Sequence, residues 1–116
     1  SYCLMLPKPN RLNLKIDYKW VNSGRELFDP NFKLVYKYGT NNNPRVGISL
    51  SSKFFKKAVD RNRARRITSR VFEILYSQLK PSVNILAVPK ADILSLELDV
   101  LLKKIESLLK QEKLIE

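Results

Sequence analysis

The chain of 116 residues contains no histidine, one cysteine and three glycines. The absence of histidine removes the side chain that most often serves as a general base or a metal ligand. The eleven acidic residues are scattered, without a D-x-D or H-x-E motif, and Gly24, Gly39 and Gly47 do not form a glycine-rich phosphate loop. We therefore predict neither catalytic residues nor a protein metal site, and expect that another molecule supplies the chemistry of any reaction involved.

Long apolar runs and secretion signals are also lacking. No stretch approaches the roughly 18 consecutive apolar residues that a membrane-spanning helix needs, and the opening SYCLMLPKPN lacks a signal-peptide cleavage pattern. Cys3 has no second cysteine with which to form an internal disulfide, and we interpret it as a bystander thiol without a function. We expect one cytoplasmic domain over residues 1–116, with an extended segment over 1–12 and no membrane partner.

Positive charge is what the chain has in excess. Lys and Arg number 22 against 11 Asp and Glu, which gives a net charge of +11. The segment Lys53–Arg70, KFFKKAVDRNRARRITSR, holds eight of these cations and one acid, Asp60. Such a density of cations displaces counterions from a phosphate backbone. A solvated helix face is the alternative, but such faces usually alternate in sign, so the pattern favours nucleic-acid binding.

Hydrophobic periodicity predicts strands and helices in an order typical of one α+β sandwich. The expected strands are 25–28, 32–38, 45–51 and the apolar run 83–88; the expected helices are 14–21, 58–79 and one N-capped by Ser95. Gly24 is expected to close the first helix in a left-handed conformation. Alternation in 32–38 and in 45–51 predicts a sheet with one buried face and one polar face. The residues expected on the polar face are Lys33, Val35, Lys37, Gly47, Ser49 and Ser51.

The long helix is predicted to dock one arc on the sheet and to present the other to a partner. Its apolar arc is expected to contain Ala64, Ile67, Val71, Ile74 and Leu75. The arginines occupy the remaining arc. A guanidinium offers paired donors to phosphate oxygens, so these side chains are candidate RNA contacts.

Several segments together carry a family resemblance. The run Lys56-Lys57-Ala58-Val59 is followed by Arg61-Asn62-Arg63 and Arg65-Arg66. Met5-Leu6-Pro7-Lys8, Asp17-Tyr18 with Gly24, Val46-Gly47 with Ser49, and Ile85–Pro89 follow the same pattern, in order, from Met5 to Lys113. The chain resembles the bacterial ribonuclease P protein component, and the resemblance makes Met5 the natural start.

The resemblance implies a fold and a role. Family members have a four-stranded sheet packed by about three helices, and a left-handed βαβ crossover carries the "RNR" helix against the general right-handed preference. They bind a catalytic RNA and help it remove the 5′ leader of precursor tRNA. The resemblance implies that the RNA performs the hydrolysis and that Mg²⁺ is bound mainly by the RNA. The implied partners are the catalytic RNA and precursor tRNA, with no obligate protein partner.

The resemblance also suggests two sets of site residues. The predicted contacts to the catalytic RNA are Lys53, Lys56, Lys57, Arg61, Asn62, Arg63, Arg65, Arg66 and Arg70. The predicted leader-binding cleft contains Arg11, Tyr18, Lys33, Val35, Lys37 and Ser49. Bracing of the helix start is the alternative for Asn62, and a place in the core is the alternative for Tyr18.

The chain departs from the family pattern at three places. Ser69 stands where the family usually has arginine, and Arg70, one residue later, is turned by about 100° around the helix. Val35 stands at a cleft position that is often aromatic, and Trp20 is a candidate for the second aromatic of the first helix. Two other functions remain open: a ribosomal-type RNA-binding module, and a protein-only nuclease, which the lack of histidine disfavours.

Overall fold

The structure is a computed structural model, and it describes residues 8–115. The predictions made for Cys3 and for Met5 lie outside the described residues.

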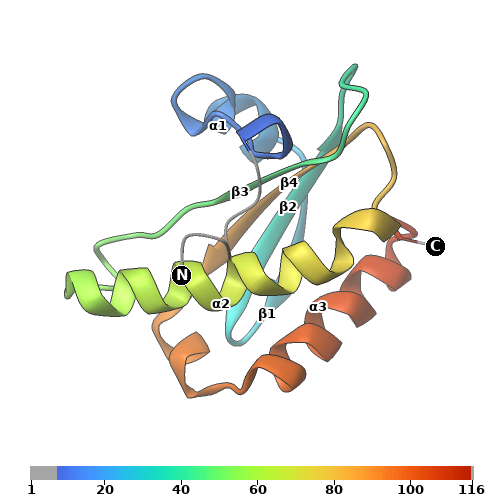
Figure 1. The fold of residues 1–116 in the computed structure, drawn as a ribbon. Coiled ribbons are helices and arrows are strands. Elements are labelled where there is room, and N and C mark those ends of the chain that lie inside the picture. Colours follow the sequence, from blue (N-terminus) through green and yellow to red (C-terminus); the bar gives the residue numbers. More distant parts are fainter. Residues whose placement is uncertain (1–7, 116) are drawn as a thin grey trace.

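A four-stranded sheet in the order β1-β2-β4-β3 forms the middle layer of the molecule (Figure 1). The strands are β1 (Arg25–Asp29), β2 (Phe32–Tyr38), β3 (Arg45–Ile48) and β4 (Val83–Pro89). The pairs β1–β2 and β2–β4 are antiparallel, and β3 is parallel to β4. The apolar sequence of β4 suits its interior position, where both faces are covered. The four predicted strands are confirmed, except that β3 ends at Ile48 instead of Ser51.

Helices cover the two faces of the sheet unequally. α1 (Leu14–Asn22) packs on one face, and α2 (Ala58–Leu75) and α3 (Leu98–Gln111) pack on the other (Figure 1). Short 3-10 helices are η2 (Lys8–Asn10), η3 (Tyr76–Gln78) and η4 (Ala91–Ser95). This mixed sheet with three helices confirms the predicted α+β fold. α2 connects the parallel strands β3 and β4; the left hand of that crossover stays a prediction.

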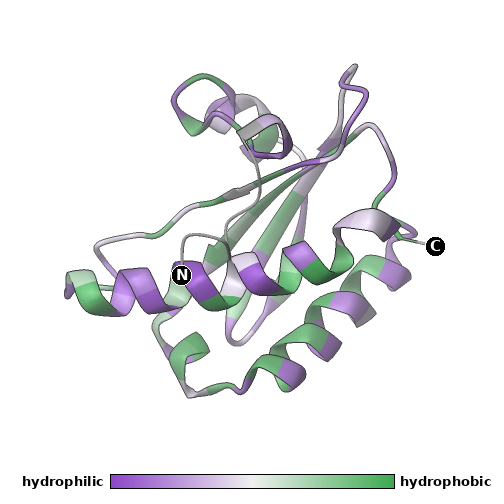
Figure 2. Ribbon diagram, viewed as in Figure 1, coloured by the Kyte–Doolittle hydropathy of each residue, from purple (hydrophilic) through white to green (hydrophobic). Residues whose placement is uncertain are grey.

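The main hydrophobic core lies between the sheet and the pair α2 and α3. Figure 2 shows hydrophobic residues recurring along both helices. Phe72 of α2 and Ile105 of α3 are fully buried against Leu34 and Ile85 of the sheet. The predicted apolar arc of α2 is wrong at Ile74, which is 40% exposed. The large ring of Phe72 occupies the interior instead. The helix is therefore rotated relative to the predicted orientation, and Ile74 lies at the edge of its buried face.

Two local predictions about helix ends are wrong. No described residue other than Lys113 has a positive φ, so Gly24 does not close α1 in a left-handed conformation. Gly24 is needed for close packing instead, because a Cβ there would collide with the carbonyl oxygen of Tyr36. Ser95 ends η4, its hydroxyl donating to Asp92 O at 2.7 Å, and the N-cap of α3 is Glu97.

The N-terminal segment is not simply extended. Residues 8–10 form η2, and Arg11 then makes a parallel bridge to Val46. Leu12 N donates to Val46 O at 3.1 Å, so this segment lies along the free edge of β3. The prediction of an extended segment over 1–12 is therefore wrong at residues 8–10, while Arg11 is paired with β3 as an extended residue.

Candidate nucleic-acid interface

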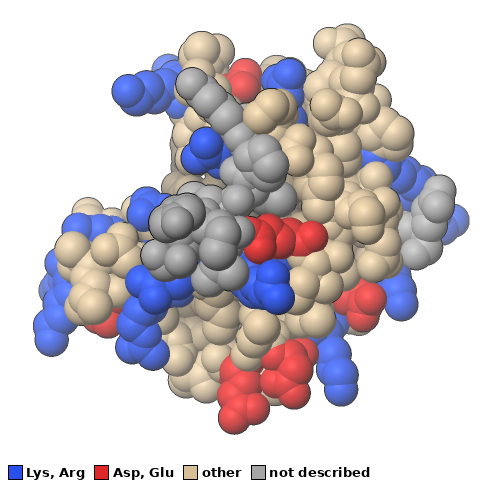
Figure 3. Space-filling view, in the orientation of Figure 1, with Lys and Arg blue, Asp and Glu red and all other residues tan. Residues whose placement is uncertain are grey.

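The basic segment that begins at Lys53 forms a loop and then the first half of α2. Lys57 is the N-cap residue, with extended backbone and no side-chain cap bond, and Asp60 lies in the first turn, where the helix dipole favours an acid. Figure 3 shows Lys and Arg side chains gathered over this end of α2, at the left of the view. Lys53, Lys56 and Lys57 are all exposed there. The predicted basic surface is therefore a continuous feature of the fold.

Arg61 differs from its neighbours because the protein itself uses its guanidinium. Arg61 Nη1 donates to the carbonyl oxygen of Phe55 at 2.7 Å, and Phe55 is only 1% exposed. This bond joins the loop 51–57 to α2. The bracing role considered for Asn62 is thus filled by Arg61, while Asn62 is exposed and accepts a bond of 3.4 Å from Arg65. The position of Arg61 argues against the predicted phosphate contact.

The remaining arginines separate onto two flanks of α2. Two residues along a helix differ in direction by about 200°, so Arg63 and Arg65 point to opposite sides. Arg63, Arg65, Arg66 and Arg70 are all exposed. Arg70 forms an ion pair with Glu73 at 3.4 Å, whereas Arg63 and Arg66 form no ion pair with the part of the chain that is described.

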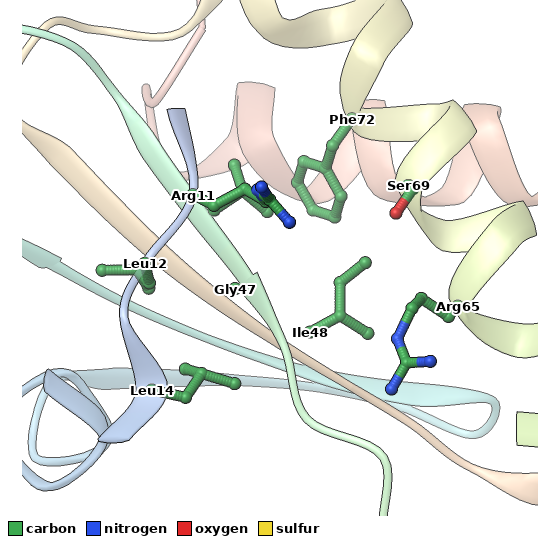
Figure 4. Close-up of a pocket in the computed structure, with 9 residues that line it drawn as sticks. Arg11, Leu12, Leu14, Gly47, Ile48, Arg65, Ser69 and Phe72 are labelled. Carbon is green, nitrogen blue, oxygen red and sulfur yellow. The ribbon is translucent and has the colours of Figure 1, made fainter. Parts of the chain in front are cut away.

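Arg65 lies on the flank near β3, across a hollow from Arg11. The two guanidinium groups lie on either side of Ile48, around a hollow of about 140 Å³ that also contains Ser69 and Phe72 (Figure 4). We call this the β3-side hollow. The hollow thus has one guanidinium group on each side, and guanidinium groups are suited to bind phosphate oxygens. Arg11, predicted in the leader cleft, is thus placed with the α2 arginines instead.

The other flank of α2 faces η4 and the beginning of α3. Here the structure forms a groove of about 300 Å³ whose lining combines arginines with aliphatic side chains. We call it the α3-side groove; its residues are Arg63, Arg66, Ile67, Arg70, Leu94, Leu96 and Leu98. The sequence predicted the arginines but not the aliphatic floor, because Leu94, Leu96 and Leu98 come from a distant segment.

The predicted leader cleft is divided on the α1 face of the sheet. Paired residues on neighbouring strands point to the same side, so the register forms rows across this face. The middle row contains Val35, Leu86 and Gly47, and Leu12 and Val21 cover it. Val35 is 0% exposed, so the prediction that it lies in an open cleft is wrong. Its small aliphatic side chain fills the contact between the sheet and α1.

Lys33 and Lys37 lie on either side of this covered row. Lys33 forms an ion pair with Glu26 at 3.2 Å. Lys37 lies on the opposite side of the covered row. Its Nζ donates to Ser23 Oγ at 3.0 Å and lies 5.0 Å from the ring centre of Trp20. The structure therefore does not bring the two lysines into one site. Lys37 and Trp20 form a cation–π pair instead.

Tyr18 and Ser49 complete the predicted cleft. Tyr18 is 39% exposed, which excludes a fully buried core position, and helix geometry turns it to the flank of α1 opposite Trp20. Ser49 follows β3, and its N–H donates to Ala87 O at 2.8 Å. Neither residue lies beside the pair formed by Lys37 and Trp20 in any described contact.

Trp20 borders a hollow of about 850 Å³ on this face. We call it the Trp20 hollow; its other lining residues are Asp17, Tyr38, Gly39, Thr40, Asn41, Asn42, Arg45 and Asn84. The segment 39–44 only connects the predicted strands 32–38 and 45–51, and no binding role was predicted for it from the sequence, so this site was missed. A signal was available, since the three consecutive asparagines Asn41–Asn43 bring several amide donors and acceptors into one short loop.

Buried contacts fix the loop that forms this hollow. Asn84, 2% exposed, donates to Asn41 Oδ1 at 2.9 Å, and the Tyr76 hydroxyl donates to Pro44 O at 2.6 Å. Burial raises the pKa of Tyr76, so this donor keeps its proton at neutral pH. Gly39 lies at the floor, where a Cβ would come within 3.0 Å of Trp20. The hollow is therefore preformed, with the Asn42 amide exposed at its rim.

The described residues do not contain a group of three His, Cys, Asp or Glu side chains that could hold a metal ion. Among the described residues, no helix is long and apolar enough to cross a membrane.

Comparison with known proteins tests the family assignment. The model of the ribonuclease P family matches residues 6–113. The chain belongs to the ribonuclease P protein family. It is similar to the ribonuclease P protein component of Pseudanabaena sp., with 34% identity over 84 residues, covering 70% of this chain and 72% of that protein. The component of Pseudoalteromonas atlantica is 38% identical over 64 residues, which cover 55% of this chain and 52% of the relative.

Solved structures of ribonuclease P proteins have the same fold. The protein of Staphylococcus aureus superposes with a TM-score of 0.81 at 21% identity, covering 93% of this chain and 92% of that chain. The protein of Thermotoga maritima gives a TM-score of 0.76 at 23% identity, covering 86% of this chain and 97% of that chain. The family model and the Pseudanabaena relative confirm the family resemblance inferred from the sequence, and the solved structures confirm the fold.

Proposed function

We propose that the chain is the protein subunit of ribonuclease P, and that it binds both the catalytic RNA and the 5′ leader of precursor tRNA. The observation that carries the proposal is the basic face of α2 in a chain of this family, with arginines directed to two flanks. In this proposal the RNA performs the hydrolysis and holds Mg²⁺. The donor set supports that division, since the sequence has no histidine.

We assign anchoring on the catalytic RNA to the α2 surface and the loop that precedes it. Arg65 with Arg11 offers one phosphate site in the β3-side hollow, and Lys56 and Lys57 extend the cationic surface. Phosphate contacts of this kind give sequence-independent affinity that falls with salt. Arg61 supports the surface through its bond to Phe55 O.

The leader of precursor tRNA is assigned to the α1 face of the sheet. An unpaired strand is bound by aromatic rings on which bases stack and by cations that follow its backbone. Trp20 supplies an exposed ring beside the cations Lys37 and Arg45, and Tyr18 supplies a second exposed ring on the other flank of α1. The preformed Trp20 hollow supports this assignment, because a rigid site loses little entropy when it binds a flexible strand.

Reconstitution tests the proposal directly. RNA-free protein is expected not to cleave precursor tRNA, while its addition to the catalytic RNA should restore leader removal at low Mg²⁺. Cleavage by the protein alone would contradict the division of labour. A ribosomal-type RNA-binding module would bind RNA without restoring cleavage, and without preferring precursor over mature tRNA.

A further inference from the structure

The α3-side groove has a lining that phosphate binding alone does not require. Leu94, Leu96 and Ile67 are only partly buried, and Leu98 is 37% exposed. A site for phosphate needs cations and donors, whereas an aliphatic floor is useful only to a ligand with an apolar face. The groove therefore selects a ligand that is anionic on one side and flat and apolar on the other.

The cations of the groove stand on one rim. Arg63, Ile67 and Arg70 recur at spacings of four and three residues, so they share one face of α2, and Arg66 lies beside them. Arg63 and Arg66 form no ion pair with any described residue, while Arg70 forms an ion pair with Glu73. At least two guanidinium groups are thus available to a ligand that enters from the α2 side.

The opposite side of the groove, at Leu98, has acidic neighbours in sequence and no cation among its lining residues. Glu97 and Asp99 flank Leu98 at the beginning of α3, and both are exposed. Acidic groups repel a phosphate from that side. The charges therefore favour a nucleic-acid backbone along the arginine rim, and an uncharged part of the ligand suits the leucines of the floor.

We propose that the α3-side groove receives one unstacked base of the catalytic RNA, with its phosphates on Arg63 and Arg66. The inference rests on the proposed function and adds to it a base-binding site distinct from the phosphate contacts. Unpaired bases in loops and bulges are the parts of a folded RNA that can be splayed out, and guanidinium planes stack on them. A volume of about 300 Å³ is at the small end of ligand pockets, which suits a single ring system.

Leu98 gives the sharpest test, because Val100 provides a matched control. Both are exposed aliphatic residues in the first turn of α3, with 37% and 41% exposure, but Val100 does not line the groove. Leu98→Asn is expected to weaken binding of the catalytic RNA by about 3- to 10-fold. This loss is a part of the free energy that burial of a leucine side chain contributes. Val100→Asn should change it less than about twofold. Both variants keep the same charge, so the salt dependence of binding should stay as in the wild type.

Chemical probing of unpaired bases in the catalytic RNA identifies the occupant. Wild-type protein and Val100→Asn should protect one such base, and Leu98→Asn should leave it reactive while the backbone footprint persists. Arg66→Ala should weaken binding and also flatten the salt dependence by about 0.7–0.9, because one phosphate is no longer neutralised.

Two results would overturn the inference. One is unchanged RNA affinity and base protection in Leu98→Asn, which an acidic protein segment in the groove would produce. The other is an equal loss in Leu98→Asn and Val100→Asn. Failure of the wild-type protein to bind the catalytic RNA at all is a different outcome, and it would refute the proposed function itself.

Discussion

Arg61 and Arg65 lie one helical turn apart in the same basic segment, yet the structure predicts opposite effects for their removal. Arg61 Nη1 donates to Phe55 O at 2.7 Å, in a half-buried position, and Arg65 is exposed beside the β3-side hollow. Arg61→Ala should therefore reduce stability and leave phosphate contacts intact. Arg65→Ala should remove a phosphate contact and leave the fold intact.

The magnitude for Arg61 follows from its single strong contact. A hydrogen bond with a charged donor contributes about 1.5–3 kcal/mol to folding, and the half-exposed guanidinium favours the lower end, about 1.5 kcal/mol. For a domain of this size, about 4 °C of melting temperature corresponds to each kcal/mol, so Arg61→Ala should melt about 6 °C lower. Removal of the bond also leaves the carbonyl of the buried Phe55 without this partner.

Two measurements on each variant separate the roles. Thermal unfolding reports stability, and affinity for the catalytic RNA across a series of KCl concentrations reports phosphate contacts. Arg65→Ala should flatten the plot of log affinity against log salt by about 0.7–0.9 and melt within about 1 °C of the wild type. Arg61→Ala should keep the wild-type slope below its melting temperature.

The reverse pattern would refute these two roles. If Arg61→Ala flattened the salt dependence as much as Arg65→Ala and melted normally, its bond to Phe55 O would be incidental. Arg61→Lys serves as a control, since it preserves the positive charge but not the planar donor geometry. It should recover little of the lost stability.

Three further predictions concern the leader site, the alkaline pH range and the core. Trp20→Ala and Tyr18→Ala should each lower holoenzyme affinity for leader-bearing precursor by roughly 5- to 150-fold, the range of base stacking, and leave mature tRNA nearly unchanged; equal losses for both RNAs would refute leader stacking. Burial raises the pKa of Tyr36, and its hydrogen bond to Glu112 raises that pKa further. The folded state therefore holds the Tyr36 proton more tightly than the unfolded state does. The stability that this protonation adds is complete below the unfolded pKa of about 10 and is lost as the pH rises through the pKa of Tyr36 in the folded state. The difference in unfolding free energy between wild type and Tyr36→Phe should thus shrink above about pH 10, and a pH-independent difference would count against it. Phe72→Ala should cost about 3–5 kcal/mol in urea unfolding, because the ring is fully buried, and a loss below about 1 kcal/mol would mean that the core repacks.

Periodicity and charge were sufficient for much of the fold. The alternation in 32–38, the apolar run of β4 and the basic beginning of α2 each predicted an element that the structure contains, and α2 also has the predicted cationic side. These features depend on residues close in sequence, so a local pattern contains them. The family resemblance added the order of the elements and the role.

Local patterns failed where a contact between distant segments decides the outcome. Val35 alternates with its neighbours as a surface residue would, but α1 covers it. Ile74 fits the apolar arc of α2, yet the ring of Phe72 occupies the interior and leaves Ile74 at the rim. In each case a local pattern predicts the direction of a side chain relative to its own element, and packing decides what lies opposite.

The sequence by itself determined that this chain is a basic, histidine-free α+β domain with a cationic helix, since charge and periodicity are properties of the chain alone. Only the tertiary structure decided how the cations are distributed. It directs Arg61 to the backbone of Phe55, brings Arg65 and Arg11 together across the edge of β3, and places Arg63 and Arg66 beside leucines from a distant segment. The physical reason is that a guanidinium acts through what surrounds it, and those surroundings come from segments brought together only by folding.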